Sequence, residues 1–518
     1  MSDLPYHIVI GLEVHVQLLT QTKLFCGCGT RFGLPPNSAT CPVCCGMPGV
    51  LPVMNRQAFE LALRAALALN CQIARFTKWD RKNYYYPDLP KNYQISQYDL
   101  PFSHDGWLEI VTEQGAKRIG IIRVHLEEDA GKMLHDEQGG GRDSLVDLNR
   151  TGTPLLEIVS RPDIRAPEEA KAYLEEIRLL LRELRVSDCE MQEGSLRCDA
   201  NVNIHVPHAD GVVVATPIVE VKNLNSFRAV ERATRYEAQR QHEEVQAKLG
   251  GAWELLPPHG SSVRQIGERK NGALRPVSKA TAGWNEERGI TQMQRRKEEA
   301  SDYRYFPEPD LAPVVVDEAW LDRVRAEVGE LPAAQRQRLP KQYGLSEYDA
   351  EVLTRQGRAF VAYFEDVAQR CGDAKTASNW LTNQVLQTLN ERKQTITDFP
   401  LSAAALSDLI QRARQTGLPA QKAREVYAHM LDTGVSVDQA FQRLGIQTVD
   451  EGQLLDIVRR AIANNPKAVA DFKNGKTKAA EAIKGAIMRE AKGMAKVDVV
   501  QQLLFQELAT SEPPDPSS

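Results

Sequence analysis

The stretch HIVIGLEVHVQL (residues 7–18) alternates apolar and polar side chains. Its even positions, from Ile8 to Leu18, are all apolar, whereas Glu13 and His15 occupy odd positions. A period of two is typical of a β-strand with one buried face, and alternate side chains of a strand project to the same side. We therefore predict a strand that buries its even positions and carries Glu13 and His15 on a polar face.

Further strands and helices are predicted along the first 300 residues. Residues 197–206 repeat the alternation. Three shorter apolar runs are predicted to be strands, at 120–126, 155–159 and 218–221. Helices are predicted from Pro167, because proline suits the first helical position, and after Ser226, because serine is a favoured N-cap. Residues 255–289 are polar and rich in Pro and Gly, which indicates a loop or an insertion.

The length and the periodicity predict the domain organisation. The chain has 518 residues, which at about 150 residues per domain indicates about three domains. Helical periodicity dominates from about residue 317, and Pro400 disfavours helix at Phe399. The predicted fold class is α+β, with an N-terminal mixed-sheet domain followed by all-α domains. The predicted boundaries are 1–296, 297–400 (helical), 401–510 (basic helical tail) and 511–518 (Pro- and Ser-rich, disordered).

Charge is unevenly distributed along the chain. Lys and Arg number 64 against 69 Asp and Glu, a formal net charge of −5. Residues 459–496 alone contain ten basic and three acidic residues, so this segment carries +7 and the rest of the chain −12. A basic helical segment of this kind is suited to a phosphate backbone. A solvated basic face without a nucleic-acid partner would explain the same charges.

Four cysteines have the spacing of a metal site. Cys26-Gly-Cys28 and Cys41-Pro-Val-Cys44 are separated by twelve residues. Two closely spaced thiolate pairs predict a small zinc-binding insertion, closed and tetrahedral, with a structural role. Reduced buried thiols and a redox Cys-x-x-Cys centre are the alternatives, and Cys45 is either a competing ligand or a bystander.

The sequence predicts neither a membrane protein nor an exported one. No stretch approaches the roughly 20 apolar residues of a membrane helix. Residues 1–19 lack the basic segment of a signal peptide. Nine cysteines over this length do not suggest a disulfide framework, so we expect a protein of the reducing cytoplasm.

Carboxylates on the predicted strands are candidates for a second metal site. The candidate residues are Glu13, His15, Glu128, Glu157 and Asp199. Glu128 continues the apolar face that ends at Leu126, and a buried charge without a partner is costly. Oxygen ligands with one imidazole suit Mg²⁺ bound to a nucleotide, although an ion pair is the alternative for each residue. No P-loop and no set of Ser/His/Asp or Cys/His nucleophiles is apparent.

Long motifs of the chain resemble one family closely. They are IGLEVH (10–15), the four cysteines with GVLPV (49–53), DRKNYYYPDLP (80–90), HLEEDAGK (125–132), NRTGTP (149–154), GSLRCDAN (194–201), EVKNLNSF (220–227) and DYRYFPEPDL (302–311). In this order, over essentially the whole chain, they resemble the GatB family, the B subunits of aspartyl/glutamyl-tRNA(Asn/Gln) amidotransferases.

The resemblance implies a heterotrimer with an amidase (A) subunit, which releases ammonia from glutamine, and a small (C) subunit. The GatB chain would bind Glu-tRNA(Gln) or Asp-tRNA(Asn), phosphorylate the side-chain carboxylate with ATP, and yield Gln-tRNA(Gln) or Asn-tRNA(Asn). The resemblance also implies that 1–296 is a cradle-shaped domain with the ATP and Mg²⁺ site. The positions matching that site are Glu13, His15, Glu128, Glu157 and Asp199, with Glu127 as an adjacent alternative.

The resemblance assigns the basic tail to tRNA. The residues predicted to contact tRNA are Lys473, Lys476, Lys478, Lys484, Arg489 and Lys492. A non-catalytic, zinc-bearing tRNA-binding scaffold is an alternative that would not need the carboxylates. A free-standing ATP-dependent amide ligase for a small acid is another, which would leave the basic tail without a role. The sequence does not indicate whether the product is Gln-tRNA, Asn-tRNA or both.

Overall fold

The computed structural model describes residues 5–135, 144–208, 211–257, 262–296, 303–446, 451–473, 476, 478–491 and 497–510. Packing divides the chain into two compact units, Met1–Leu331 and Pro332–Ser518. Within the described ranges, no helix is both long and apolar enough to cross a membrane.

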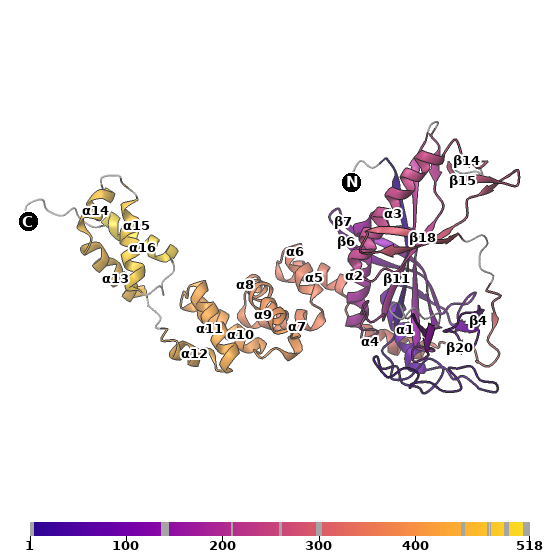
Figure 1. The fold of residues 1–518 in the computed structure, drawn as a ribbon. Helices are drawn as coiled ribbons and strands as arrows, with labels where there is room; N and C mark the ends of the chain where they lie inside the picture. The colour runs from indigo at the N-terminus through magenta and orange to yellow at the C-terminus, as the bar shows by residue number, and fades with distance from the viewer. Residues whose placement is uncertain are drawn as a thin grey trace, which may run out of the picture. The chain divides into compact units, whose positions relative to one another are not determined.

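A large mixed sheet lies at the centre of the first unit (Figure 1). Its strands are β1 (His7–Gln17), β2 (Gln72–Ile73), β6 (Ser103–Thr112), β7 (Gly115–Glu128), β10 (Pro154–Ser160), β11 (Leu196–Pro207), β12 (Val213–Ala215), β13 (Val219–Lys222), β14 (Trp253–Leu255), β15 (Val263–Lys270), β16 (Ala273–Pro276), β17 (Ala280–Asn285) and β18 (Ile290–Arg296). The main order is β14-β15-β12-β11-β1-β10-β7-β6-β2, and β13, β16, β17 and β18 branch from it. Most pairs are antiparallel, whereas β12–β15 and β13–β17 are parallel.

Three smaller sheets complete the strands that the structure describes in this unit. They contain β3 (Phe76–Thr77) with β20 (Val314–Val315), β4 (Asp80–Asn83) between β5 (Tyr93–Ser96) and β19 (Phe306–Pro307), and β8 (Lys132–His135) with β9 (Ser144–Asp147). The pairing of β4 with β19 joins segments that are more than 200 residues apart, because Phe306 lies opposite Arg81.

Helices cover the apolar face of the large sheet. They are α1 (Arg56–Ala68), α2 (Pro167–Glu183) and α3 (Phe227–Lys248), and α4 (Glu318–Val328) packs on α1. Their buried side chains share one core with the even positions of β1, of which Ile10 and Val14 are fully buried. Ser226 caps α3 by accepting a hydrogen bond from the Ala229 N–H, and Pro167 begins α2, as predicted. The other face of β1 is therefore left for polar side chains.

The second unit is helical throughout its described residues. Its helices are α5 (Pro332–Tyr343), α6 (Glu347–Arg355), α7 (Arg358–Cys371), α8 (Ala374–Trp380), the π-helix η2 (Leu381–Val385), α9 (Leu386–Arg392), the 3₁₀-helix η3 (Ile396–Asp398), α10 (Ala403–Gln415), α11 (Ala420–Thr433), α12 (Val437–Arg443), α13 (Glu451–Ala463), α14 (Pro466–Lys473), α15 (Ala479–Glu490) and α16 (Val497–Thr510). One core spans Leu339 to Phe441, and another spans Leu454 to Leu508.

The α+β fold class predicted from the sequence is confirmed. The predicted loop at 255–289 is wrong, because β15 to β17 lie there. Asn271 and Gly272, with φ of 53° and 81°, make a tight turn between β15 and β16, and Asn-Gly is a strong hairpin signal. The hydrophobic cores begin and end at other residues than the domain boundaries predicted at 296 and 400. These two boundaries stay predictions. The predicted disordered end, 511–518, lies outside the described residues.

Candidate metal and catalytic site

The register of the central strands brings polar side chains into one row. His15 on β1 lies opposite Glu157 on β10 and Arg197 on β11, and Glu157 lies opposite His125 on β7. Residues that face each other across neighbouring strands project to the same side of a sheet. Four strands from distant parts of the sequence therefore place these four side chains on the polar face.

Three side chains of this face have the donor set of a metal site. One ligand atom from each of His15, Glu127 and Glu157 lies within 4.8 Å of the other two. His15 Nε2 is 3.6 Å from Glu157 Oε2, and His125 Nε2 is 3.3 Å from the same oxygen. Two carboxylates and an imidazole fit a divalent cation. We call His15, Glu127 and Glu157 the ligand group.

The surroundings of the two buried carboxylates of the ligand group favour their ionised form. Burial opposes the charge on Glu157, but His125 and His15 outweigh burial and hold the pKa of Glu157 well below its usual value. Burial also opposes charge on Glu127, whereas Lys82, 4.0 Å away, and His125 lower its pKa. Ionised carboxylates in a site of low dielectric attract a cation strongly.

Glu13 and Asp199 lie beside the ligand group but outside it. They face each other across β1 and β11. Asn201 donates a hydrogen bond from Nδ2 to Glu13 Oε1 at 2.9 Å, while burial and the nearby Glu157 raise the pKa of Glu13. Asp199 is ion-paired with Lys222. Both predicted residues therefore share the polar face with the ligand group.

Glu128 does not join the other predicted site residues. Neighbouring residues on a strand project to opposite sides, so Glu128 projects to the same side as Leu126, whereas Glu127 projects to the polar face. Glu128 forms a buried ion pair with Lys91 and accepts a hydrogen bond from the Ile95 N–H at 3.0 Å. The structure thus satisfies the buried charge of Glu128 with a lysine and puts Glu127 in the ligand group.

His125 and Lys82 were missed by the sequence reasoning. His125 alternates with Val124 and Leu126, so the period of two on this strand could have placed it on the polar face with Glu127. Lys82 lies on β4, in a different sheet, and no periodic pattern predicts its approach to Glu127.

A cavity of about 580 Å³ opens beside Asp199. This volume lies in the range of small-molecule sites. Five basic side chains line it, namely Arg31, Lys132, Arg150, Arg197 and Lys222, against three acidic ones, Asp147, Glu193 and Asp199. The cavity is therefore suited to an anionic ligand next to the polar face.

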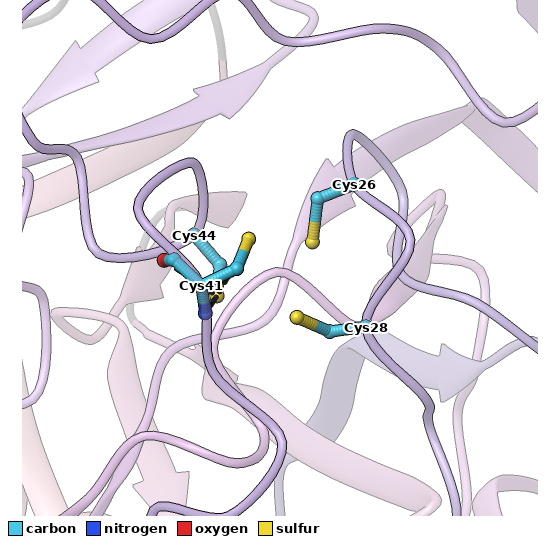
Figure 2. A group of neighbouring side chains, drawn as sticks. All are labelled: Cys26, Cys28, Cys41 and Cys44. Atoms are coloured by element: carbon cyan, nitrogen blue, oxygen red, sulfur yellow. Dashed lines mark hydrogen bonds between the residues drawn. The ribbon is translucent and has the colours of Figure 1, made fainter.

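The predicted cysteines converge as a second group (Figure 2). The sulfur atoms of Cys26, Cys28, Cys41 and Cys44 all lie within 4.8 Å of one another, and Cys41 Sγ is 3.9 Å from Cys44 Sγ. Tetrahedral zinc with bonds of about 2.3 Å would separate its sulfur ligands by about 3.8 Å. The spacing fits zinc, and Cys45, the competing ligand, is not in the group.

Lys23 lies under the cysteine group. It is fully buried, and Lys23 Nζ donates to Ala39 O at 2.8 Å and to Cys44 Sγ at 3.5 Å. A hydrogen bond from the Cys26 thiol, supported by Lys23, lowers the pKa of Cys44 to about 4. Cys44 is thus held as a thiolate, the form that binds metal.

The basic tail is partly described. Lys473 ends α14, Lys476 and Lys478 precede α15, and Lys484 and Arg489 lie on α15. Lys484 pairs with Glu481 at 2.7 Å, and Lys476 pairs with Asp471 at 3.1 Å. Lys492 lies outside the described residues.

Comparison with known proteins identifies the family. A family model described as the GatB/GatE catalytic domain matches residues 8–322, and one described as the GatB domain matches residues 362–508. The chain is 49% identical over 507 residues to the B subunit of aspartyl/glutamyl-tRNA(Asn/Gln) amidotransferase from Rhodopirellula baltica, covering 98% of this chain and 97% of that one. It is 46% identical to the protein of the same name from Carboxydothermus hydrogenoformans, covering 97% and 99% of the two chains, and 47% identical to that from Moorella thermoacetica, covering 97% and 100%. The chain belongs to the GatB family, the B subunits of tRNA-dependent aspartyl/glutamyl amidotransferases.

Proposed function

We propose that this chain activates the side-chain carboxylate of Glu-tRNA(Gln), Asp-tRNA(Asn) or both with ATP, and that ammonia then converts the activated carboxylate into an amide. The observation that carries the proposal is the ligand group, whose carboxylates are buried and ionised. A tRNA-binding scaffold would not need two carboxylates and an imidazole whose ligand atoms lie within 4.8 Å of one another.

The ligand group fits Mg²⁺ by its chemistry. Glu127 and Glu157 supply two hard oxygen donors and His15 supplies a nitrogen, with Glu13 and Asp199 close by on the same face. Magnesium is held in many phosphoryl-transfer sites by one or two carboxylates together with substrate phosphates. When bound, it would neutralise charge on the transferred phosphoryl group.

The basic residues of the 580 Å³ cavity would hold the phosphates of ATP. A carboxylate oxygen of the substrate attacks the γ-phosphorus, and the bond from that phosphorus to ADP breaks. Ammonia then attacks the carbonyl carbon of the acyl phosphate, the carbon–oxygen bond to phosphate breaks, and ammonia loses a proton. Activation is needed because a free carboxylate has a poor leaving group, whereas phosphate is a good one.

We also propose that the cysteine group holds structural zinc and that the chain works with an amidase (A) subunit and a small (C) subunit. The four sulfur atoms at tetrahedral spacing support zinc. The relatives are named as B subunits, which supports an assembly with further subunits, one of which would supply the ammonia. All nine cysteines are free thiols, which suits the reducing cytoplasm.

Assembly with the two partner proteins tests the proposed function. The heterotrimer, given ATP, Mg²⁺ and glutamine, is expected to convert Glu-tRNA(Gln) or Asp-tRNA(Asn) to the amide, with one ADP formed per amide. Ammonium chloride should replace glutamine, because the chemistry of this chain uses ammonia. Binding of tRNA without ADP or amide formation would favour the scaffold instead.

The basic tail gives a prediction of its own. Replacing Lys478 and Arg489 together by Gln should weaken tRNA binding and make the negative slope of log K against log salt shallower by about 2, one for each lost phosphate contact. Filter binding over a range of salt concentrations measures this slope. The control is Lys171→Gln on α2, where the lysine is 40% exposed. An unchanged slope in the double variant would contradict a tRNA contact at these residues.

A further inference from the structure

Four tyrosines form a continuous row in the first unit. The ring centroids of Tyr84 and Tyr303 are 6.0 Å apart, those of Tyr303 and Tyr305 are 6.0 Å apart, and Tyr305 stacks on Tyr98 at 4.1 Å with an angle of 7°. We call these four residues the tyrosine row. The row is assembled from two distant segments because β4 pairs with β19.

The inner, half-buried part of the row reaches the ligand group at Tyr303, its second ring. Lys82 Nζ lies 5.1 Å from the centre of the Tyr303 ring and 4.0 Å from Glu127 Oε2. The Asn83 N–H donates to Tyr303 O at 2.9 Å, which fixes the backbone at this end. A single cation therefore touches both the aromatic row and a carboxylate of the site.

The outer end of the row is open to solvent. Tyr98 is 51% exposed, whereas Tyr84, Tyr303 and Tyr305 are half-buried. A row built only for core packing would bury its last ring, as the core does with Phe59 and Phe102. The row instead runs from the carboxylates to the surface and ends in a stacked pair.

We propose that the tyrosine row stacks the unpaired nucleotides at the 3′ end of the aminoacyl-tRNA and so directs the esterified amino acid toward the ligand group. This inference rests on the proposed function and adds a binding site to it. Bases stack on aromatic side chains without regard to sequence. The rings of Tyr84, Tyr303 and Tyr305 meet edge to face at 72°, so the exposed ring of Tyr98 is the platform that the row offers to a base.

The geometry favours an RNA strand over the adenine of ATP. ATP has one base and needs one stacking surface, whereas the row has four rings, and its exposed ring, Tyr98, lies beyond the rings that surround Lys82. The amino acid is attached to the last nucleotide, so the strand must approach with that nucleotide innermost. Lys82 lies at this inner end, where a cation would face the last phosphate of the strand.

Variants of the exposed ring test the proposal in the assembled heterotrimer. Tyr98→Leu should raise the KM for aminoacyl-tRNA about tenfold, while the KM for ATP and the glutaminase activity stay unchanged. Tyr98→Phe retains the ring and should keep the KM near that of the wild type. Tyr348→Leu, which replaces a tyrosine that is 76% exposed on α6, is the matched control.

A fluorescence measurement distinguishes the loss of base stacking from a general disturbance of the protein's structure. A tRNA carrying 2-aminopurine at an unpaired position before the last nucleotide should lose fluorescence on binding the wild type and Tyr98→Phe, and should retain more of it with Tyr98→Leu. An unchanged KM for tRNA and unchanged fluorescence in Tyr98→Leu, or a raised KM for ATP alone, would overturn the inference. The proposed function fails separately, if the wild-type heterotrimer forms no amide.

Discussion

Glu157→Gln is expected to abolish amide formation by the assembled heterotrimer while leaving its glutaminase activity intact. Glu157 is the residue on which the site converges, because both His15 and His125 approach the same oxygen, at 3.6 and 3.3 Å. The glutamine side chain of this variant keeps the shape of glutamate and removes its charge. Losing a group that stabilises transferring charge in a buried site costs about 100-fold or more in kcat.

The same variant should lose divalent-metal affinity, which is measurable without turnover by titration with Mn²⁺. Glu109→Gln is the matched control, because Glu109 lies on β6 of the same sheet and pairs with Arg118 at 3.8 Å, away from the ligand group. Wild-type kcat in Glu157→Gln, or equal losses in both variants, would remove the ligand group from the mechanism. Thermal unfolding of both variants shows whether the fold has survived.

The strands that carry the site were predictable because each has a simple pattern. The alternation in β1 identified the buried face and put Glu13 and His15 on the other one. The pattern of one strand contains no information about its neighbours, however. That His15 lies opposite Glu157 follows from the pairing of β1 with β10, which are about 140 residues apart and whose register depends on tertiary structure.

Glu128 shows how a sound rule can select the neighbouring residue. A carboxylate that continues an apolar face is unusual, and this rule singled out Glu128. The structure resolves the conflict with Lys91, whose side chain is only 5% exposed in its pair with Glu128. Glu127 follows a polar pattern, so this rule does not select it, although it lies in the ligand group. Burial identifies an unusual charge, and only the three-dimensional partners distinguish an ion pair from a ligand.

The register of β7 is a second reason why the face predicted for this strand is only partly correct. Its pairing with β10 shifts between Val159 and Ser160, so that Ile121 lies opposite Ser160 while Ile122 is left exposed. A bulge of this kind changes which residues share a face, and no period of two survives across it. The expected face of Ile122, Val124 and Leu126 therefore holds only for its last two members.

Cys44→Ser is expected to remove most of the zinc and to lower the free energy of unfolding by several kcal/mol. Structural zinc contributes on the order of 10 kcal/mol in isolated zinc-finger peptides, and losing one of four ligands forfeits much of that contribution. Cys44 is the cysteine of the group with the strongest reason to be a thiolate, because it accepts from the Cys26 thiol and from the buried Lys23. Serine would leave the Lys23 ammonium buried without that anionic partner.

Cys45→Ser is the control for this prediction, since Cys45 is adjacent in sequence but outside the four-cysteine group. Elemental analysis of the freshly purified proteins should give one zinc per chain for the wild type and for Cys45→Ser, and much less for Cys44→Ser. Denaturant unfolding should rank the three proteins in the same way. A wild type without zinc would refute the zinc site. Equal loss of zinc in the two variants would instead make Cys45 a ligand, because only a ligand's removal should release the metal from a closed tetrahedral site.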